Sequence, residues 1–510
     1  MNIATPIKYR ATYNKDKMAV IFEDKKFTYE ELNDRINRLA NALLAKGITK
    51  GKRVAYWMEN CNEIVETYFA IAKTGAAMVP LSTAYTPASA RDVINNSEAE
   101  VLIFQDIFAE AVKEMIPTMP SIKNLIFIGT KPDLNAEEYE SVLASSSGRE
   151  PAVEVGMDDI LGLIPTGGST GLPKLIVLPH GRQVWVSIGS ILALGLREDD
   201  VYLNALPLFH GAGQTQAMNN TLFMGGTIVI LRRARPEMEL QTIEKYRCTC
   251  AMNMPPAFIT WLRQVPDARK YDVSSIRIYY LAGGPMSLKL RKDVFDFFPN
   301  ATLYYIWGYG EMGPDGSALR VQRENPAWKD GSCGVPLMDA DWQIVDWEDR
   351  PVPVGVEGEI GLKGPHMAKE YYKNKKETEA TFRKGWVYSG DIMKADEDGY
   401  LYFVDRKKDM IKSGGLNVYA NEVEGMILSH PKVSDAAVIG VPDPKWGEAV
   451  KGIVVLKEGE RATADEIISY CKEKLERFKV PKSIDFITSM PRNPSGKIMK
   501  YELRQQYTPK

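Results

Sequence analysis

Apolar and polar residues follow one another along the first third of the chain in a rhythm that predicts helices separated by short strands. Four apolar residues recur at the spacing of one helix face: Leu32, Ile36, Leu39 and Leu43. This helix is predicted to begin at Thr28, which forms a capping-box pattern with Glu31, and to end at Gly47. Short apolar runs that are typical of buried strands stand at 53–57, 101–104 and 125–128, and a second helix is predicted around 64–72.

This alternation predicts an α/β fold with a large N-terminal domain of stacked, mostly parallel sheets. After about residue 330, glycines, prolines and short β-rich runs dominate, which predicts a small β subdomain over about 330–404. The charged segment 405–409 separates this region from one with its own helix–strand alternation, in which a helix is predicted over 464–478. We therefore predict an N-terminal domain over 1–404 and a smaller α+β C-terminal domain over 410–510.

Length, charge and cysteine content narrow the class of protein. A chain of 510 residues is too long for one hydrophobic core. The 64 basic and 66 acidic residues nearly balance, so we expect no general affinity for nucleic acid or anionic membranes. The five cysteines are scattered and odd in number, which favours a reducing compartment. No apolar run is long enough for a membrane span, and the start lacks an apolar signal core, so a cytoplasmic location is expected.

The strongest single feature is a loop of small residues that follows the apolar run ending at Pro165. Its candidate phosphate-binding residues are Thr166, Gly167, Gly168, Ser169, Thr170, Gly171 and Lys174. Glycines let backbone N–H groups approach a polyphosphate, hydroxyls add hydrogen-bond donors, and a lysine neutralises charge. The spacing differs from that of the Walker loop, because Lys174 follows a proline and no Ser or Thr comes directly after it. The loop therefore indicates a nucleotide site of another kind.

This loop resembles the signature loop of the adenylate-forming superfamily, which contains acyl- and aryl-CoA synthetases, adenylation domains and beetle luciferases. Further motifs occur in the superfamily's order over essentially the whole chain. Those with site residues are 206–210 (His210), 281–286 (Gly283, Gly284, Pro285), 388–391 (Asp391), 402–415 (Arg406, Lys408, Gly414, Gly415) and 494–497 (Lys497).

The resemblance implies a role for each of these residues. His210 lies near the carboxylate-binding pocket, and Gly283, Gly284 and Pro285 lie against adenine. Asp391 and Arg406 bind the ribose. Lys497 is the adenylation lysine, which bridges the substrate carboxylate and the α-phosphate. Lys408 marks a hinge at 405–409 about which a mobile C-terminal domain rotates between two steps, and Gly414 and Gly415 let the backbone approach the pantetheine of coenzyme A.

One motif departs from the superfamily's pattern of Tyr-Gly-x-Thr-Glu. Placing Tyr309 and Gly310 on it would leave no glutamate, whereas placing Trp307 and Gly308 on it keeps Glu311. We prefer the second alignment, because Mg²⁺ needs a hard oxygen ligand. Trp307 can then stack on adenine. Gly310 replaces the usual threonine, and Gly308 stands where acetate-specific relatives carry a second indole, so the acid is expected to be larger than acetate.

The resemblance implies an AMP-forming ligase that uses ATP and Mg²⁺ to make an acyl-adenylate and then passes the acyl group to coenzyme A. Its partners are then a small carboxylic acid and CoA, and the protein is a monomer or homodimer. Three alternatives stay open: loading of a separate carrier protein, a luciferase-like oxygenase, and a non-catalytic protein that binds an acyl-adenylate.

Overall fold

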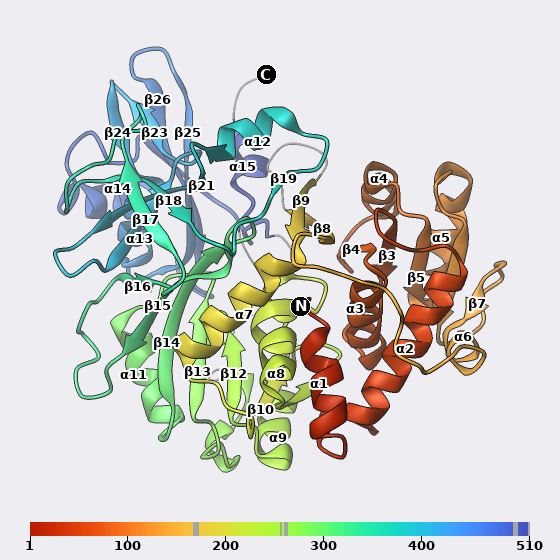
Figure 1. The fold of residues 1–510 in the computed structure, drawn as a ribbon. Helices are drawn as coiled ribbons and strands as arrows, with labels where there is room; N and C mark the ends of the chain where they lie inside the picture. Colours follow the sequence, from red (N-terminus) through yellow and green to blue (C-terminus); the bar gives the residue numbers. More distant parts are fainter. Residues whose placement is uncertain (167–172, 256–257, 260–263, 493–497, 508–510) are drawn as a thin grey trace. The chain divides into compact units, whose positions relative to one another are not determined.

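The computed structural model describes the chain except for residues 167–172, 256–257, 260–263, 493–497 and 508–510 (Figure 1). The chain divides into two compact units. The first comprises the described residues of Met1–Gly168, Leu172–Trp342 and Leu362–Val387, and the second those of Gln343–Gly361 and Tyr388–Lys510. Within the described residues, no helix combines the length and the apolar character that crossing a bilayer requires.

One sheet of the first unit has eight strands in the order β19-β9-β8-β4-β3-β5-β6-β7 (Figure 1). Their bounds are β3 Arg53–Trp57, β4 Ala77–Pro80, β5 Val101–Gln105, β6 Asn124–Ile128, β7 Glu137–Glu138, β8 Ile160–Thr166, β9 Lys174–Pro179 and β19 Glu370–Tyr371. Neighbours are parallel except at β8–β9 and β9–β19. Successive residues of β3 pack into two different hydrophobic clusters, one on each face of the sheet. Because both faces are buried, the sequence of such a strand is a continuous apolar run.

The second sheet of this unit runs β16-β15-β14-β13-β12-β10-β11-β1-β2. Its strands are β1 Met18–Phe22, β2 Lys25–Thr28, β10 Val201–Asn204, β11 Thr227–Ile230, β12 Cys250–Asn253, β13 Ile278–Ala282, β14 Thr302–Tyr309, β15 Gly313–Val321 and β16 Ser332–Pro336. The neighbours from β1 to β14 are parallel, and the outer pairs β1–β2, β14–β15 and β15–β16 are antiparallel. The expected stack of mostly parallel sheets is therefore confirmed.

Helices fill the space between the two sheets and cover their outer faces. The helices between them are α2 Tyr29–Ala45, α3 Asn62–Thr74, α7 His180–Leu194 and α8 Asn220–Met224, whose apolar residues share one hydrophobic core with both sheets. The others in this unit are α1 Thr5–Tyr13, α4 Pro87–Ser97, α5 Ala109–Met115, α6 Tyr139–Ala144, α9 Pro236–Tyr246, α11 Leu288–Phe297 and α12 Lys375–Thr381. The predicted capping box is present, since Thr28 and Glu31 each accept a hydrogen bond from the other's backbone N–H.

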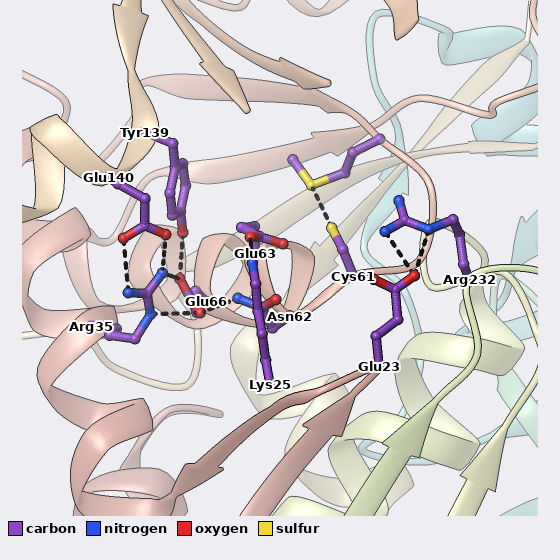
Figure 2. A network of polar contacts seen from close by, with 11 residues as sticks. Glu23, Lys25, Arg35, Cys61, Asn62, Glu63, Glu66, Tyr139, Glu140 and Arg232 are labelled. Carbon is purple, nitrogen blue, oxygen red and sulfur yellow. Dashed lines mark hydrogen bonds and ion pairs between the residues drawn. The ribbon is translucent and has the colours of Figure 1, made fainter. Parts of the chain in front are cut away.

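A buried polar network joins α2, α3 and α6 (Figure 2). The Glu66 side chain is fully buried and accepts hydrogen bonds from Arg35 Nε at 2.9 Å, Tyr139 Oη at 2.9 Å and Asn62 Nδ2 at 2.8 Å. Arg35 also binds Glu140, which is half exposed. Burial raises the pKa of Glu66, and Arg35 opposes that rise. The network thus fastens three helices through one buried carboxylate.

The second unit contains strands β17 Asp341–Val345, β18 Gly358–Lys363, β21 Trp386–Ala395 and β22 Leu401–Arg406, some of which begin or end in the first unit. A further sheet has the order β24-β23-β26-β25, with β27 beside β26. Its strands are β23 Ile411–Ser413, β24 Leu416–Val418, β25 Val433–Asp443, β26 Gly447–Leu456 and β27 Ser483–Phe486. Helices α13 Ala420–Leu428 and α14 Ala464–Lys472 share one core with this sheet, and α15 Lys500–Tyr507 packs into a separate cluster on it.

The helix predicted over 464–478 is too long at its C-terminal end. It begins as expected, because the Thr463 side chain accepts a hydrogen bond from Glu466 N, but α14 ends at Lys472. Leu475 then reaches the core from a turn, in which its backbone N–H donates to Cys471 O at 2.9 Å. Apolar spacing alone does not distinguish a last helical turn from a turn that buries the same side chains.

Candidate active site

The predicted phosphate loop connects two antiparallel strands, β8 and β9. Thr166, at the end of β8, pairs with Lys174, at the start of β9, and its hydroxyl donates to Lys174 O at 3.4 Å. Gly167, Gly168, Ser169, Thr170 and Gly171 lie outside the described residues. The Lys174 ammonium forms an ion pair with Glu377 and lies 5.4 Å from the centre of the Tyr371 ring. The hairpin therefore fixes both ends of the loop and the position of its lysine.

The residues predicted to contact adenine lie where two parallel strands end. Gly283 and Gly284 directly follow β13, and Trp307 lies in the last part of β14, whose Ile306 pairs with Ala282. Gly283 has φ +80°, which favours glycine, and Gly284 O accepts a hydrogen bond from Tyr305 Oη at 2.9 Å. The carboxyl ends of neighbouring parallel strands are the usual ligand-binding edge of an α/β sheet. Gly308 and Pro285 continue this edge.

Glu311 lies in the turn between β14 and β15, and three contacts hold that turn. Arg182 Nη2 donates to Gly310 O at 2.7 Å, and Ala368 N donates to Glu311 O at 2.7 Å. The Tyr371 hydroxyl donates to the Glu311 carboxylate. The structure thus brings Lys174 and Glu311 together around Tyr371, a residue that no quoted sequence motif contained.

Position 310 has little room for the threonine of the superfamily's pattern. A Cβ atom there would lie 2.8 Å from Ile176 Cδ1 and 3.8 Å from Thr166 Cγ2. The glycine is therefore matched by an isoleucine that occupies part of the space of the missing side chain.

His210 lies at the start of an unusual helical segment. Its side chain is exposed, which excludes a buried structural imidazole, and its Nδ1 accepts from Ala212 N at 3.3 Å. The π-helix Ala212–Asn219 follows directly. π-Helical segments are rare in proteins, and those that do occur often lie at functional sites.

Buried polar side chains link this π-helix, α7 and β15 by hydrogen bonds. Gln216 and Ser190 both donate to the carboxylate of Asp315, and burial raises the pKa of Asp315. Arg182 donates to Gln183 Oε1 at 3.0 Å, and burial lowers the pKa of Arg182 to about 10. The sequence motifs contain neither Arg182 nor Asp315, since the proximity of these two side chains arises only from the fold.

In the second unit, Asp391 and Arg406 face each other on neighbouring strands. They are paired in register between β21 and β22, and Arg406 Nε lies 3.5 Å from Asp391 Oδ1. Asp391 is buried, and its backbone N–H donates to Ser389 Oγ at 2.9 Å. The structure thus places the two predicted ribose-binding residues side by side.

The predicted hinge at 405–409 begins in the last two residues of β22 and continues into the turn after that strand. Asp409 N donates to Arg406 O at 2.9 Å, which closes a turn with Lys407 and Lys408 at its centre. Burial and the neighbouring Arg406 lower the pKa of Lys408. Asp409 also binds Arg504 of α15 at 2.8 Å.

Gly414 and Gly415 form the tip of the β23–β24 hairpin. Both have positive φ, at +61° and +82°, and Gly414 N donates to Trp446 O at 2.7 Å. A Cβ at Gly414 would lie 2.8 Å from the Trp446 ring, whereas nothing lies within 4 Å of one at Gly415. The hairpin tip requires glycine for its backbone. Lys497 lies outside the described residues.

Comparison with known proteins places these features in a family. Residues 7–372 match the AMP-binding enzyme family, and residues 422–497 match the AMP-binding enzyme C-terminal domain. A feruloyl-CoA synthase of Amycolatopsis sp is 35% identical, with 98% of this chain and 97% of the relative covered. A crotonobetaine/carnitine–CoA ligase of Proteus mirabilis is 34% identical, with 96% of each chain covered.

A solved structure extends the likeness to the fold. The anthranilate CoA ligase AuaEII in complex with anthranoyl-AMP superposes with a TM-score of 0.90 at 26% identity, covering 99% of this chain and 97% of the other. Both family matches, taken with near-complete coverage of the relatives, lead to one conclusion. The chain belongs to the AMP-binding enzyme family.

Proposed function

We propose that this chain is a Mg-ATP-dependent carboxylic acid–CoA ligase. It forms an acyl-adenylate and pyrophosphate from an acid and ATP, then transfers the acyl group to CoA and releases AMP. The observation that carries this function is the similarity, over nearly the full length of both chains, to CoA ligases. We further propose a cytoplasmic enzyme that acts as a monomer or homodimer and has no nucleic-acid partner.

The first step joins two anions, so the enzyme must position them and neutralise their charge. An oxygen of the acid's carboxylate attacks the α-phosphorus of ATP, and the bond to the β-phosphate's bridging oxygen breaks to release pyrophosphate. Residues 166–174, with Lys174 at their end, hold the phosphates from the β8–β9 hairpin. Lys497 bridges the carboxylate and the α-phosphate, while Asp391 and Arg406 bind the ribose.

Glu311 fits the Mg²⁺ that this chemistry requires. Its carboxylate is a hard oxygen donor, and the described part of the chain contains no group of three or more His, Cys, Asp or Glu that could hold a metal ion alone. Mg²⁺ is commonly held by one or two carboxylates together with substrate phosphates. When bound, the ion neutralises charge on the departing pyrophosphate.

In the second step the CoA thiol attacks the acyl carbonyl carbon, and AMP leaves as the C–O bond to its phosphate breaks. Gly414 and Gly415 at the β23–β24 hairpin let pantetheine approach the backbone, and the hinge at Lys408 allows the C-terminal domain to change position between steps. The acid is larger than acetate, because Gly308 leaves space where a second bulky ring would close the pocket.

The test is pyrophosphate release with Mg-ATP and CoA across a panel of carboxylic acids, beside a Lys497→Ala variant. We expect acid-dependent release with a matching acyl-CoA product in the wild type and a large loss in the variant. Release without acyl-CoA, with hydroxamate formed on adding hydroxylamine, would instead indicate another acceptor such as a carrier protein. ATP binding without release for any acid would contradict the proposal.

A further inference from the structure

Tyr371 contacts two residues of the proposed ATP site, one that holds the phosphates and one that holds Mg²⁺. Its hydroxyl donates to Glu311 Oε1, and the Lys174 ammonium lies 5.4 Å from the centre of its ring. The side chain is only 7% exposed. A single tyrosine therefore connects the lysine at the end of the phosphate loop to the carboxylate predicted to hold Mg²⁺.

The backbone around Tyr371 is fixed to the same elements. The short strand β19 pairs with β9, with Tyr371 opposite Ile176. On either side, Lys369 N donates to Val177 O at 3.0 Å and Tyr372 N donates to Leu175 O at 2.8 Å. Ala368 N donates to the backbone carbonyl of Glu311. A shift of this strand would thus move the lysine's strand and the glutamate's turn together.

The ring and the hydroxyl of Tyr371 have separate effects. The ring packs in a small apolar cluster with Ile176, Leu178 and Phe382, which fixes its plane beneath Lys174. An ammonium over an aromatic face is attracted by the ring's quadrupole. The hydroxyl donates to one carboxylate oxygen, which orients the group while other lone pairs remain for a cation. Partners that orient a metal ligand commonly contribute strongly to metal affinity.

We propose that Tyr371 is a positioning residue for adenylation: its hydroxyl orients Glu311 toward the cation, and its ring directs Lys174 toward the phosphates of the same nucleotide. This role rests on the proposed function. Glu377, the ion-pair partner of Lys174, holds the ammonium from a second side. Tyr371 acts through Glu311 and Lys174 and touches no reacting atom itself.

The matched pair of variants is Tyr371→Phe and Tyr372→Phe. Both remove one hydroxyl, but that of Tyr372 donates to Glu98 Oε2 at 3.1 Å, on the surface. The probe is Mn²⁺, whose binding to enzyme saturated with a non-hydrolysable ATP analogue is followed by electron paramagnetic resonance. This measurement needs no acid, so it remains valid even if no acyl-CoA product is found.

We expect Tyr371→Phe to weaken Mn²⁺ binding about tenfold or more, with Tyr372→Phe equal to the wild type. In pyrophosphate release, Tyr371→Phe should raise the Mg²⁺ concentration at half-maximal rate by a similar factor while the KM for the acid stays unchanged. Equal Mn²⁺ affinities of Tyr371→Phe and Tyr372→Phe would overturn the proposal.

A double-mutant cycle separates positioning from general damage. In a Glu311→Gln background, Tyr371→Phe should cause no further loss of Mn²⁺ affinity, because the carboxylate that it orients is gone. Full additivity of the two losses would show that Tyr371 affects the site by another route and would overturn the proposal. Tyr371→Leu, which also removes the ring, should in addition raise the KM for ATP.

Discussion

At the scale of single residues, Gly310 shows how one position depends on its neighbour. A threonine there would press its Cβ against Ile176 Cδ1 at 2.8 Å. We expect Gly310→Thr to lower the free energy of unfolding by about 1–3 kcal/mol. Ile176→Val deletes the obstructing atom, so the double variant should lose less than the sum of the two single losses in urea unfolding. Strict additivity would show that Ile176 does not set the space at position 310.

His180 provides a pH-dependent test at the same scale. It is fully buried, and neither ring nitrogen has a hydrogen-bond partner in the described part of the chain. Burial lowers its pKa to about 4, partly opposed by Asp159. Between the unfolded value of 6.5 and about 4, the unfolded chain takes up a proton that the folded chain does not. Its contribution to stability is therefore complete above pH 6.5 and decreases as the pH falls.

We expect the loss of this contribution to reach about 3 kcal/mol by pH 4. His180→Leu removes the titrating group and roughly preserves the volume. The unfolding free energy of the wild type, relative to that of the variant, should fall by this amount between pH 6.5 and pH 4. Parallel pH profiles of the two proteins would mean that the imidazole titrates normally in the folded state.

Residue chemistry could be predicted from the sequence where a motif is local and not where partners are distant. Residues 166–174 carry their glycines, hydroxyls and lysine within one short segment. Arg182 and Gly310 are 128 positions apart, and Tyr371 and Glu311 are 60 apart. A tyrosine or arginine in isolation indicates neither contact. Only the fold gives these side chains their partners: β19 pairs with β9, and Ala368, just before β19, binds the backbone of Glu311 in the turn after β14.

At the scale of secondary-structure elements, the network of Figure 2 contains two carboxylates that bind the same arginine but differ in burial. Glu66 is 0% exposed and Glu140 is 52% exposed, and both bind Arg35. Glu66→Ala leaves buried donors of Tyr139 and Asn62 unpaired, so we expect a loss of about 3–5 kcal/mol of unfolding free energy. Glu140→Ala should cost about 1 kcal/mol or less. Similar losses in urea unfolding would show that burial does not separate the two contacts.

Element type followed from the sequence more reliably than element length. The run at 53–57 forms β3 with the predicted bounds, since both faces of that strand are buried and the four residues after Arg53 are apolar or aromatic. The helix predicted around 64–72 extends over Asn62–Thr74, ending at Gly75 in the left-handed conformation. The excess length predicted for α14 arose because Leu475 and Phe478 are packed from turns.

At the scale of the whole molecule, two features of the sequence predicted more than one domain. They are the rise in glycines, prolines and short β-rich runs after about residue 330 and the charged segment at 405–409. The structure groups residues differently in detail, because Gln343–Gly361 belongs to the second compact unit with Tyr388–Lys510. Strands such as β18 and β21 contribute to both units, and a linear boundary cannot represent that. The hinge at Lys408 remains a prediction, which kinetics can test.

Lys408 lies at the centre of the turn closed by Asp409 N and Arg406 O, where proline would restrict both itself and the residue before it. If the C-terminal domain must change position between the two steps, Lys408→Pro should impair them unequally. We expect ATP–pyrophosphate exchange to persist while acyl-CoA formation falls at least about tenfold further. Lys408→Ala removes the charge but leaves the backbone free, so it should retain both activities. If Lys408→Pro loses both half-reactions equally, the turn supports the site without acting as a hinge. If Lys408→Ala loses as much acyl-CoA formation as Lys408→Pro, the effect belongs to the ammonium and not to the backbone.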